Sequence, residues 1–195
     1  QRLCLPRCPR REETLVTSVA LVTSVTLATA VAPVILVTPV TLPSQRVLEL
    51  NDHLMLFYTG IARTASAIAG SYVPDISSRE HKISEITDMV DEGISVLNSR
   101  QDITRFGELL HRAWDLKRSM SAMVSNPHVD EIYQRAQTAG AVGGKLLGAG
   151  GGGFMLLFAP PSQQEKISEA LGNLVQVPFK FETSGSQIIF FDAEE

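Results

Sequence analysis

The chain has 195 residues, of which 44% are hydrophobic and 19% are charged, and its formal net charge is −4. That length suits one well-buried domain with an appendage. Because the charge is negative and basic residues do not cluster among aromatic ones, the composition argues against nucleic-acid binding, and small anions or proteins are the expected partners.

The first 36 residues differ in composition from the rest, and we place the domain at residues 37–195. Arginines and both cysteines, Cys4 and Cys8, precede the stretch from Thr14 to Gln45, which holds no charged residue. Remnant strands, a membrane anchor, a disordered tail and sequence that is not natively in frame with the rest are competing interpretations. Ser, Thr and Pro interrupt the apolar residues, whereas a spanning helix needs about 20 predominantly apolar ones. A membrane role is therefore disfavoured.

The cysteines predict neither a metal site nor a disulfide framework in the domain. Cys4 and Cys8 form a single Cys-x-x-x-Cys pair, and no second Cys or His pair stands at a suitable spacing. A domain without cysteine suits a reducing cytoplasm, which is the expected location.

Four helices and a strand are expected in the first part of the domain. A strand over 53–59 leads into a helix over 62–72, and a capping box of Ser77 and Glu80 opens the next helix, which Gly93 weakens. Asn126 and Pro127 begin a later helix that ends at Gly140. The inner face of the helix after Ser77 would carry Ile83, Ile86, Val90, Ile94 and Leu97. The inner face of the helix capped by Asp102 would carry Ile103, Phe106, Leu109, Leu110, Ala113, Leu116 and Met120, with Trp114 in the core.

Strands and one helix are expected in the last part. An apolar strand over 154–158 precedes a helix that Ser162 and Glu165 open and that ends near Leu174. Two strands follow over 177–181 and 187–191. The pattern predicts an α+β sandwich, in which helices cover an antiparallel sheet.

Glycine is concentrated between Leu147 and Phe154. Gly148, Gly150, Gly151, Gly152 and Gly153 enclose a single Ala149. Such a loop can adopt positive φ and converge its NH groups on an anion such as a phosphate. The same composition would also serve a tight turn against a neighbouring strand, and neither the Walker pattern nor the dinucleotide fingerprint is present.

Three segments together resemble the GHMP kinases, a superfamily of sugar and metabolite kinases. The run from Lys145 to Phe158 resembles their third, C-terminal glycine-rich motif. Residues 56–66 and 114–127 resemble the D-glycero-D-manno-heptose 7-phosphate kinase branch, whose close relative is fucokinase. The resemblance covers the chain from about Val37 to Asp192 and implies a ferredoxin-like C-terminal domain.

The superfamily's substrate motif and its ATP-loop motif are not found in this sequence. In the kinases that the chain resembles, an N-terminal domain carries these motifs, the magnesium carboxylate and the catalytic base. The resemblance therefore implies the C-terminal part of an ATP-dependent kinase that phosphorylates the anomeric hydroxyl of a heptose 7-phosphate, with ATP and Mg²⁺ as cofactors and an N-terminal kinase domain as partner. No catalytic residue is expected in this chain. A non-catalytic ferredoxin-like module and a fucokinase-type substrate remain as alternatives.

The resemblance also implies candidate binding residues. The cofactor-binding candidates are Gly148, Ala149, Gly150, Gly151, Gly152 and Gly153, which would line the cleft beside the ATP phosphates. The substrate-binding candidates are Thr59, Gly60, Arg63, Ser66 and Lys117. Arg63 follows a strand-to-helix junction, where a guanidinium can grip a phosphate, but an ordinary ion pair would also explain it. Lys117 equally fits the polar face of its helix. His111 is expected to be a structural histidine.

Overall fold

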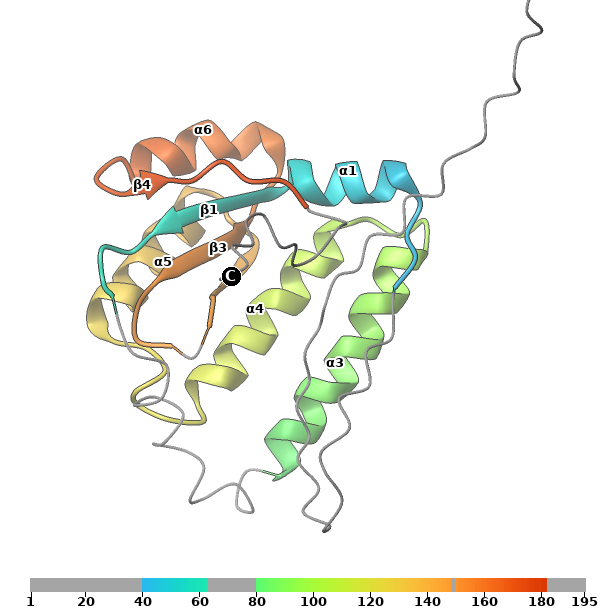
Figure 1. Ribbon diagram of the computed structural model, residues 1–195, viewed down its shortest axis with the longest axis horizontal. Coiled ribbons are helices and arrows are strands. Elements are labelled where there is room, and N and C mark those ends of the chain that lie inside the picture. The colour runs from blue at the N-terminus through green and yellow to red at the C-terminus, as the bar shows by residue number, and fades with distance from the viewer. Residues whose placement is uncertain (1–39, 63–79, 149, 182–195) are drawn as a thin grey trace, which may run out of the picture.

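The computed structural model describes residues 40–62, 80–148 and 150–181 (Figure 1). The elements in chain order are α1 (Ser44–Asp52), β1 (Leu54–Tyr58), α3 (Glu80–Asn98), α4 (Thr104–Arg118), α5 (Pro127–Ala139), β2 (Gly143–Leu146), β3 (Phe154–Phe158), α6 (Pro161–Ala170) and β4 (Val175–Gln176). No helix among the described residues is long and apolar enough to cross a membrane.

The strands form one antiparallel sheet in the order β2-β3-β1-β4. β1 pairs with β3 along its full length, from Leu54 opposite Phe158 to Tyr58 opposite Phe154. β4 pairs with the other edge of β1, and β2 with the other edge of β3. A strand, helices, two strands, a helix and a strand in this arrangement make a ferredoxin-like unit, so the predicted fold is confirmed.

One face of the sheet packs on α5 and α6. Because side chains alternate along a strand, Met55 and Phe57 of β1 share this face with Met155 and Leu157 of β3. They form the main hydrophobic cluster with residues of both helices, and its largest member is Trp114 of α4, which is 1% exposed.

The opposite face packs near one end on a second cluster, built by α1, α3 and α4. The cluster contains Phe158 of β3, Leu50 of α1 and Leu97 of α3. α3 and α4 lie side by side in Figure 1. Arg46 pins α1 to them, because its guanidinium donates to Val96 O at 2.9 Å and to Gln101 O at 2.8 Å.

Glycine lets α4 lie directly against β2. A Cβ added to Gly143 would stand 1.9 Å from Gly107 O, and one added to Gly107 would stand 2.4 Å from Phe158 Cδ1. Glycine at 143 therefore lets the α4 backbone approach β2, and glycine at 107 leaves room for the Phe158 ring.

Several predicted elements are confirmed. The strands expected over 53–59 and 154–158 are β1 and β3. Asn126 caps α5 through its side chain, Pro127 stands at the first turn, and Gly140 ends the helix with φ 116°.

The predicted cap of α4 is wrong, because its N-cap is Ile103 rather than Asp102 and no side chain caps the helix. Asp102 Oδ1 accepts from Thr104 N at 2.9 Å, and hydrogen bonding to Thr104 holds the pKa of the carboxyl below its usual value.

The predicted inner face of α3 is wrong except for Leu97, which is buried as expected. Its buried residues are Met89, Gly93, Val96 and Leu97, whereas the predicted Ile83, Ile86, Val90 and Ile94 are half-buried. Gly93 is the reason, because a Cβ built on it would lie 3.3 Å from Leu109 Cδ2. The residue expected to weaken the helix is the point at which α4 comes closest.

Two predictions near the end of the described chain are also wrong. Ser162 and Glu165 form no capping box, since α6 begins at Pro161 with Pro160 as N-cap, and it ends at Ala170 rather than near Leu174. No strand covers 177–181, because the ladder on β1 comprises Val175 and Gln176, and Pro178 has no NH with which to extend it.

The sequence analysis did not anticipate α1 and β2. β2 contains Gly143 and Gly144, which have low strand propensity, and its burial is decided by α4 and β3. The expected helix over 62–72, the Ser77 cap and the strand over 187–191 lie outside the described residues, as do residues 1–36.

We expect Gly143→Ala to lower the free energy of unfolding by about 3 kcal/mol, because the new methyl group must displace the α4 backbone. Urea denaturation measures the change. Gly172→Ala is the control, since its Cβ would meet nothing closer than Glu169 O at 3.3 Å, and we expect it to cost less than about 0.5 kcal/mol. Equal losses of stability in the two variants would show that the close contact between Gly107 and Gly143 does not exclude a side chain at position 143.

Candidate functional site

The glycine-rich loop between β2 and β3 has a backbone that side chains would disfavour. The φ angles of Gly148, Gly150, Gly151 and Gly153 are 79°, 126°, 73° and 102°. L residues rarely adopt such values. Glycine is therefore required by conformation at these four positions.

Close packing is a second reason for glycine in this loop. A Cβ on Gly150 would lie 2.6 Å from Val124 O, and one on Gly152 would lie 2.6 Å from Ile61 Cγ2. The loop thus lies between the segment that follows β1 and the segment that precedes α5. Part of its glycine content serves the packing of a turn, as the alternative interpretation of the sequence proposed.

Hydrogen bonds hold the loop on the side of β1. Thr59 donates to Gly153 O from both its backbone N and its Oγ1, each at 2.9 Å, and Gly153 N donates to Ile61 O at 2.8 Å. Thr59 is 1% exposed. Its hydroxyl consequently fixes the position of the loop's last residue.

Further hydrogen bonds hold the loop on the side of α5. Gly151 N donates to Val124 O at 2.9 Å, and Asn126 Nδ2 donates to Gly151 O at 2.9 Å. Asn126 also caps α5, because its Oδ1 accepts from Val129 N at 3.1 Å. One side chain therefore couples the start of α5 to the middle of the loop.

The remaining NH groups of the loop do not anchor it to the described part of the protein. In the described part of the chain, the backbone N atoms of Gly148, Gly150 and Gly152 donate no hydrogen bond. Free NH groups on a loop with positive φ angles are what an anion-binding concavity requires. At Gly148 the backbone is also open, because among the described residues a Cβ there would meet nothing within 4 Å.

Lys117 brings a positive charge to the loop. Its Nζ donates to Gly148 O at 2.7 Å from the last turn of α4. Burial, and secondarily the charge of Lys145, lowers the pKa of Lys117 to about 8. Burial also lowers the pKa of Lys145, which lies in β2.

The structure brings several predicted site residues together. Thr59 and Lys117 both contact the loop, and Gly60, with φ 79°, follows Thr59 at the same place. Arg63, Ser66 and Ala149 lie outside the described residues. Ligand contact by any of these residues stays a prediction.

Sequence reasoning missed Asn126 and Lys145 as parts of this site. Asn126 was predicted as a helix cap, and that role concealed its second bond to Gly151 O. Lys145 stands two residues before the loop, and its position in the glycine-rich segment was the available signal.

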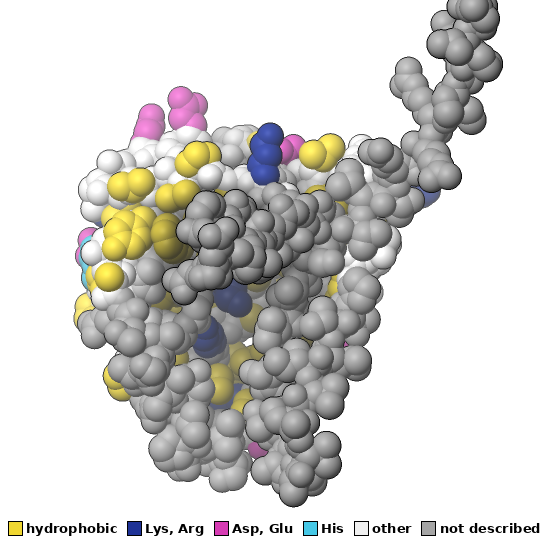
Figure 2. Space-filling view, in the orientation of Figure 1, with side chains coloured by type: hydrophobic (Ala, Val, Ile, Leu, Met, Phe, Trp, Pro, Cys, Tyr) yellow, Lys and Arg dark blue, Asp and Glu magenta, His cyan; other side chains and the backbone are white. Residues whose placement is uncertain are grey.

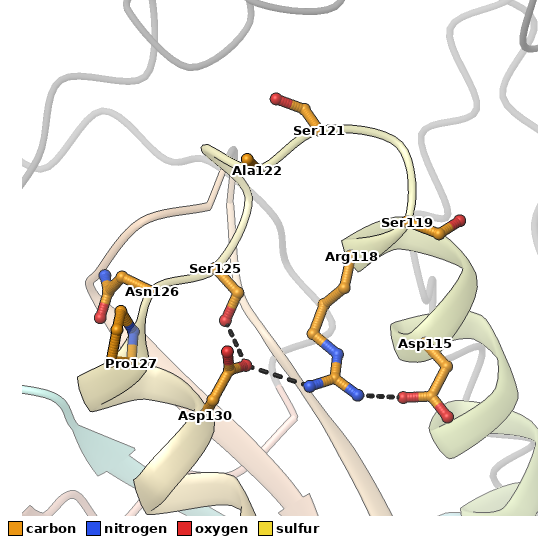
Figure 3. A pocket seen from close by; sticks show the side chains of 9 residues that line it. All are labelled: Asp115, Arg118, Ser119, Ser121, Ala122, Ser125, Asn126, Pro127 and Asp130. Carbon is orange, nitrogen blue, oxygen red and sulfur yellow. Dashed lines mark hydrogen bonds and ion pairs between the residues drawn. The ribbon is translucent and has the colours of Figure 1, made fainter.

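A shallow pocket of about 490 Å³ lies between the end of α4 and the start of α5, next to the glycine-rich loop. Figure 3 shows Arg118 between Asp115 and Asp130, with Ser125 directed at the same Asp130. Arg118 Nη1 donates to Asp130 Oδ1 at 3.0 Å, and Ser125 Oγ donates to that oxygen at 2.7 Å. Asn126 lines both this pocket and the loop.

The polar groups beside this pocket are largely satisfied by one another. Arg118 also pairs with Asp115, and its guanidinium lies 5.8 Å from the centre of the Trp114 ring. His111 Nδ1 lies 2.8 Å from Tyr133 Oη. Asp115 and Arg118 thus act within the protein, and His111 has a structural partner, as expected.

The model of the family described as GHMP kinases C terminal matches residues 95–176. This part of the chain is therefore similar to the C-terminal domain of the GHMP kinases. The matched segment begins within α3, yet β1 lies between β3 and β4, so the domain also needs upstream residues to complete its sheet.

Individual relatives agree with the GHMP kinase match. The chain is 29% identical over 136 residues to a D-glycero-alpha-D-manno-heptose 7-phosphate kinase of Campylobacter jejuni, covering 63% of this chain and 37% of the relative. A putative sugar kinase from Campylobacter jejuni is similar in structure, with TM-score 0.54 and 28% identity over 77% of this chain and 42% of that one.

A more distant neighbour shows the fold alone. L. major mevalonate kinase, in complex with R-mevalonate, superposes with TM-score 0.57 and 24% identity, covering 63% of this chain and 40% of its own. The chain therefore spans about two fifths of the length of the relatives it matches.

Two substitutions separate the roles of Asn126. Asn126→Asp keeps the acceptor for Val129 N but removes the donor to Gly151 O, whereas Asn126→Ala removes both. We expect Asn126→Ala to lower the free energy of unfolding by about 1–2 kcal/mol, and Asn126→Asp by less. Hydrogen exchange should show the Gly151 NH losing protection in both variants; full protection in Asn126→Asp would mean that the amide does not hold the loop.

The lowered pKa of Lys117 makes stability depend on pH. Its usual value is 10.5 and its folded value about 8, so between these the unfolded chain binds more protons, and the free energy of unfolding should rise as pH increases. We expect wild type to gain on the order of 1 kcal/mol relative to Lys117→Met across this window, after allowing for partial exposure of the amine. Chemical denaturation at several pH values measures the difference, and parallel curves would contradict the assignment.

Proposed function

We propose that this chain supplies the C-terminal domain of an ATP-dependent sugar kinase, with the glycine-rich loop as the wall beside the transferring phosphate. The supporting observation is the set of unused NH groups at Gly148, Gly150 and Gly152, beside the ammonium of Lys117. Phosphoryl transfer depends mainly on positioning and on offsetting the charge of the transferring group. Fixed NH dipoles and a nearby cation provide both.

The residues present fit the phosphates of ATP. Among the described residues, a Cβ on Gly148 or Gly153 would meet nothing within 4 Å, so the loop is open to a ligand there. The loop is also anchored on both sides, which keeps its free donors in fixed positions. Within the described residues, no group of three or more His, Cys, Asp or Glu side chains could hold a metal ion. The resemblance to the GHMP kinases implies that the ligands of Mg²⁺, and the base that takes the proton from the sugar, belong to an N-terminal domain.

The substrate that we propose is a heptose 7-phosphate, phosphorylated on its anomeric hydroxyl. The γ-phosphoryl group would pass from ATP to that oxygen, and the hydroxyl proton to the base. The support is the similarity to the Campylobacter jejuni heptose 7-phosphate kinase at 29% identity. A fucokinase-type substrate and a non-catalytic module are the alternatives.

Calorimetry of the 195-residue chain with Mg-ATP, with and without heptose 7-phosphate, tests the loop. We expect binding that Gly148→Ala weakens about tenfold, because a side chain at φ 79° would disturb the donors. Gly140→Ala is the matched control, since Gly140 has φ 116° but ends α5 away from the loop. Both changes should cost about 1–2 kcal/mol of stability, and equal effects on binding would exclude a specific role for the loop.

A fusion tests substrate and catalysis. In it, this chain replaces the matching region of the Campylobacter jejuni relative, and phosphoryl transfer from ATP is measured with heptose 7-phosphate and with fucose. Turnover of heptose 7-phosphate supports the proposed substrate, and turnover of fucose would favour the fucokinase-type substrate instead. A folded fusion that turns over neither would favour the non-catalytic module.

A further inference from the structure

Two lysines beside the glycine-rich loop have no carboxylate partner. Lys117 of α4 and Lys145 of β2 are both half-buried, and they are close enough for the charge of Lys145 to act on Lys117. Among the described residues, neither takes part in an ion pair, and the hydrogen bond of Lys117 is to Gly148 O. Arg46, Arg112 and Arg118, by contrast, each pair with a carboxylate.

Within the described residues, no charged group from the neighbouring elements offsets these two cations. On α4, Asp115 is engaged with Arg118 and Arg112 with Glu92 of α3. Lys82 of α3 donates to Ser119 O. Across the ladder from Lys145, β3 presents Leu156, and the loop itself holds no titratable residue. The arrangement concentrates positive charge at one end of the loop.

Such an arrangement is unfavourable in the empty protein. Removing a cation from water without pairing it costs free energy, and a second cation nearby adds repulsion. The lowered pKa values of both lysines report that cost. Perturbed groups that lie together beside a polar loop are candidates for function, and an anion is the ligand whose charge would offset these two cations.

We propose that Lys117 and Lys145 form a subsite for a doubly charged phosphate group, which the free NH groups of the glycine-rich loop complete. Two ammonium groups match the two negative charges of a phosphate. Hydrogen bonds between a charged donor and a charged acceptor are stronger than those between neutral groups. The phosphate is that of the nucleotide or that of the sugar phosphate. Only this choice of ligand rests on the proposed function.

An alternative explanation for Lys117 is structural. A cation in the last turn of a helix complements the helix dipole, and Lys117 and Arg118 both stand in the last turn of α4. This explanation does not extend to Lys145, which lies in a strand. The two accounts differ in outcome, because a structural lysine stabilises the empty protein, whereas a ligand-binding pair destabilises it until the phosphate is bound.

Binding should be linked to proton uptake. At about pH 8 Lys117 is roughly half protonated, and a bound phosphate raises its pKa, so that binding takes up about half a proton. Phosphate monoesters are already fully ionised at that pH and release none. At about pH 6 the lysine is fully charged but a phosphate monoester is only about half ionised, so binding of the doubly charged form should release protons instead of taking them up.

Calorimetry with two probes tests the subsite. The full chain is titrated at about pH 8 with ATP and, separately, with mannose 6-phosphate, in two buffers of different ionisation enthalpy. We expect one probe to bind with proton uptake, and Lys117→Met and Lys145→Met each to weaken it at least about tenfold. Lys166→Met is the control, since Lys166 is exposed on α6, and it should bind like wild type.

Thermal unfolding of the same variants excludes a merely structural effect. We expect Lys145→Met to have the same Tm as wild type or a higher one, because an unpaired half-buried cation has been removed. The identity of the bound probe says which phosphate the subsite holds. If neither probe binds, or if Lys145→Met binds as wild type does, the proposal is overturned.

Acetylation provides a readout at the level of single residues. Acetic anhydride at about pH 8 should modify Lys117 and Lys145 in the free chain, and the bound probe should protect both while leaving Lys166 reactive. Equal protection of all three lysines would count against the subsite. Protection without turnover by the fusion would retain the subsite and refute the kinase, so the two proposals fail separately.

Discussion

The pairing of β1 with β3 is the interaction on which the rest of this structure depends. Their register places Tyr58 opposite Phe154, so the residues that follow β1 meet the residues that precede β3. Thr59 can therefore donate twice to Gly153 O, and Ile61 O can accept from Gly153 N. A shift of one residue would exchange the two faces of both strands and remove the loop from its anchors.

The loop combines fixed and unused backbone groups. The NH groups of Gly151 and Gly153 donate to Val124 O and Ile61 O, whereas those of Gly148, Gly150 and Gly152 donate no hydrogen bond in the described structure. Next to them lie lysines whose charges nothing in the described chain offsets. Figure 2 shows hydrophobic side chains gathered where β1, β3 and β4 lie, and Phe154 and Val175 are 40% and 63% exposed. Unused backbone NH groups and exposed apolar surface thus occur together at this end of the sheet.

Elements whose signals are local were predictable. The ends of α5 follow from Asn126, Pro127 and Gly140, because caps act within a few residues of themselves. The apolar run of β3 needed no partner to be recognised. Most of the inner face of α3 and the extent of β4 were predicted wrongly, since Gly93 packs against α4 and the ladder of β4 depends on its neighbour β1. Periodicity cannot report a contact between segments distant in sequence.

The sequence by itself determined that the chain has an α+β fold, that a glycine-rich loop precedes an apolar strand, and that the whole resembles a kinase C-terminal domain. Those properties are written in local composition, periodicity and motif order. The tertiary structure decided which loop NH groups remain free, that Asn126 holds the loop as well as capping a helix, and that Lys145 joins Lys117. These depend on the packing of α4, α5 and the sheet, which brings together residues whose separation along the chain says nothing about their distance in space.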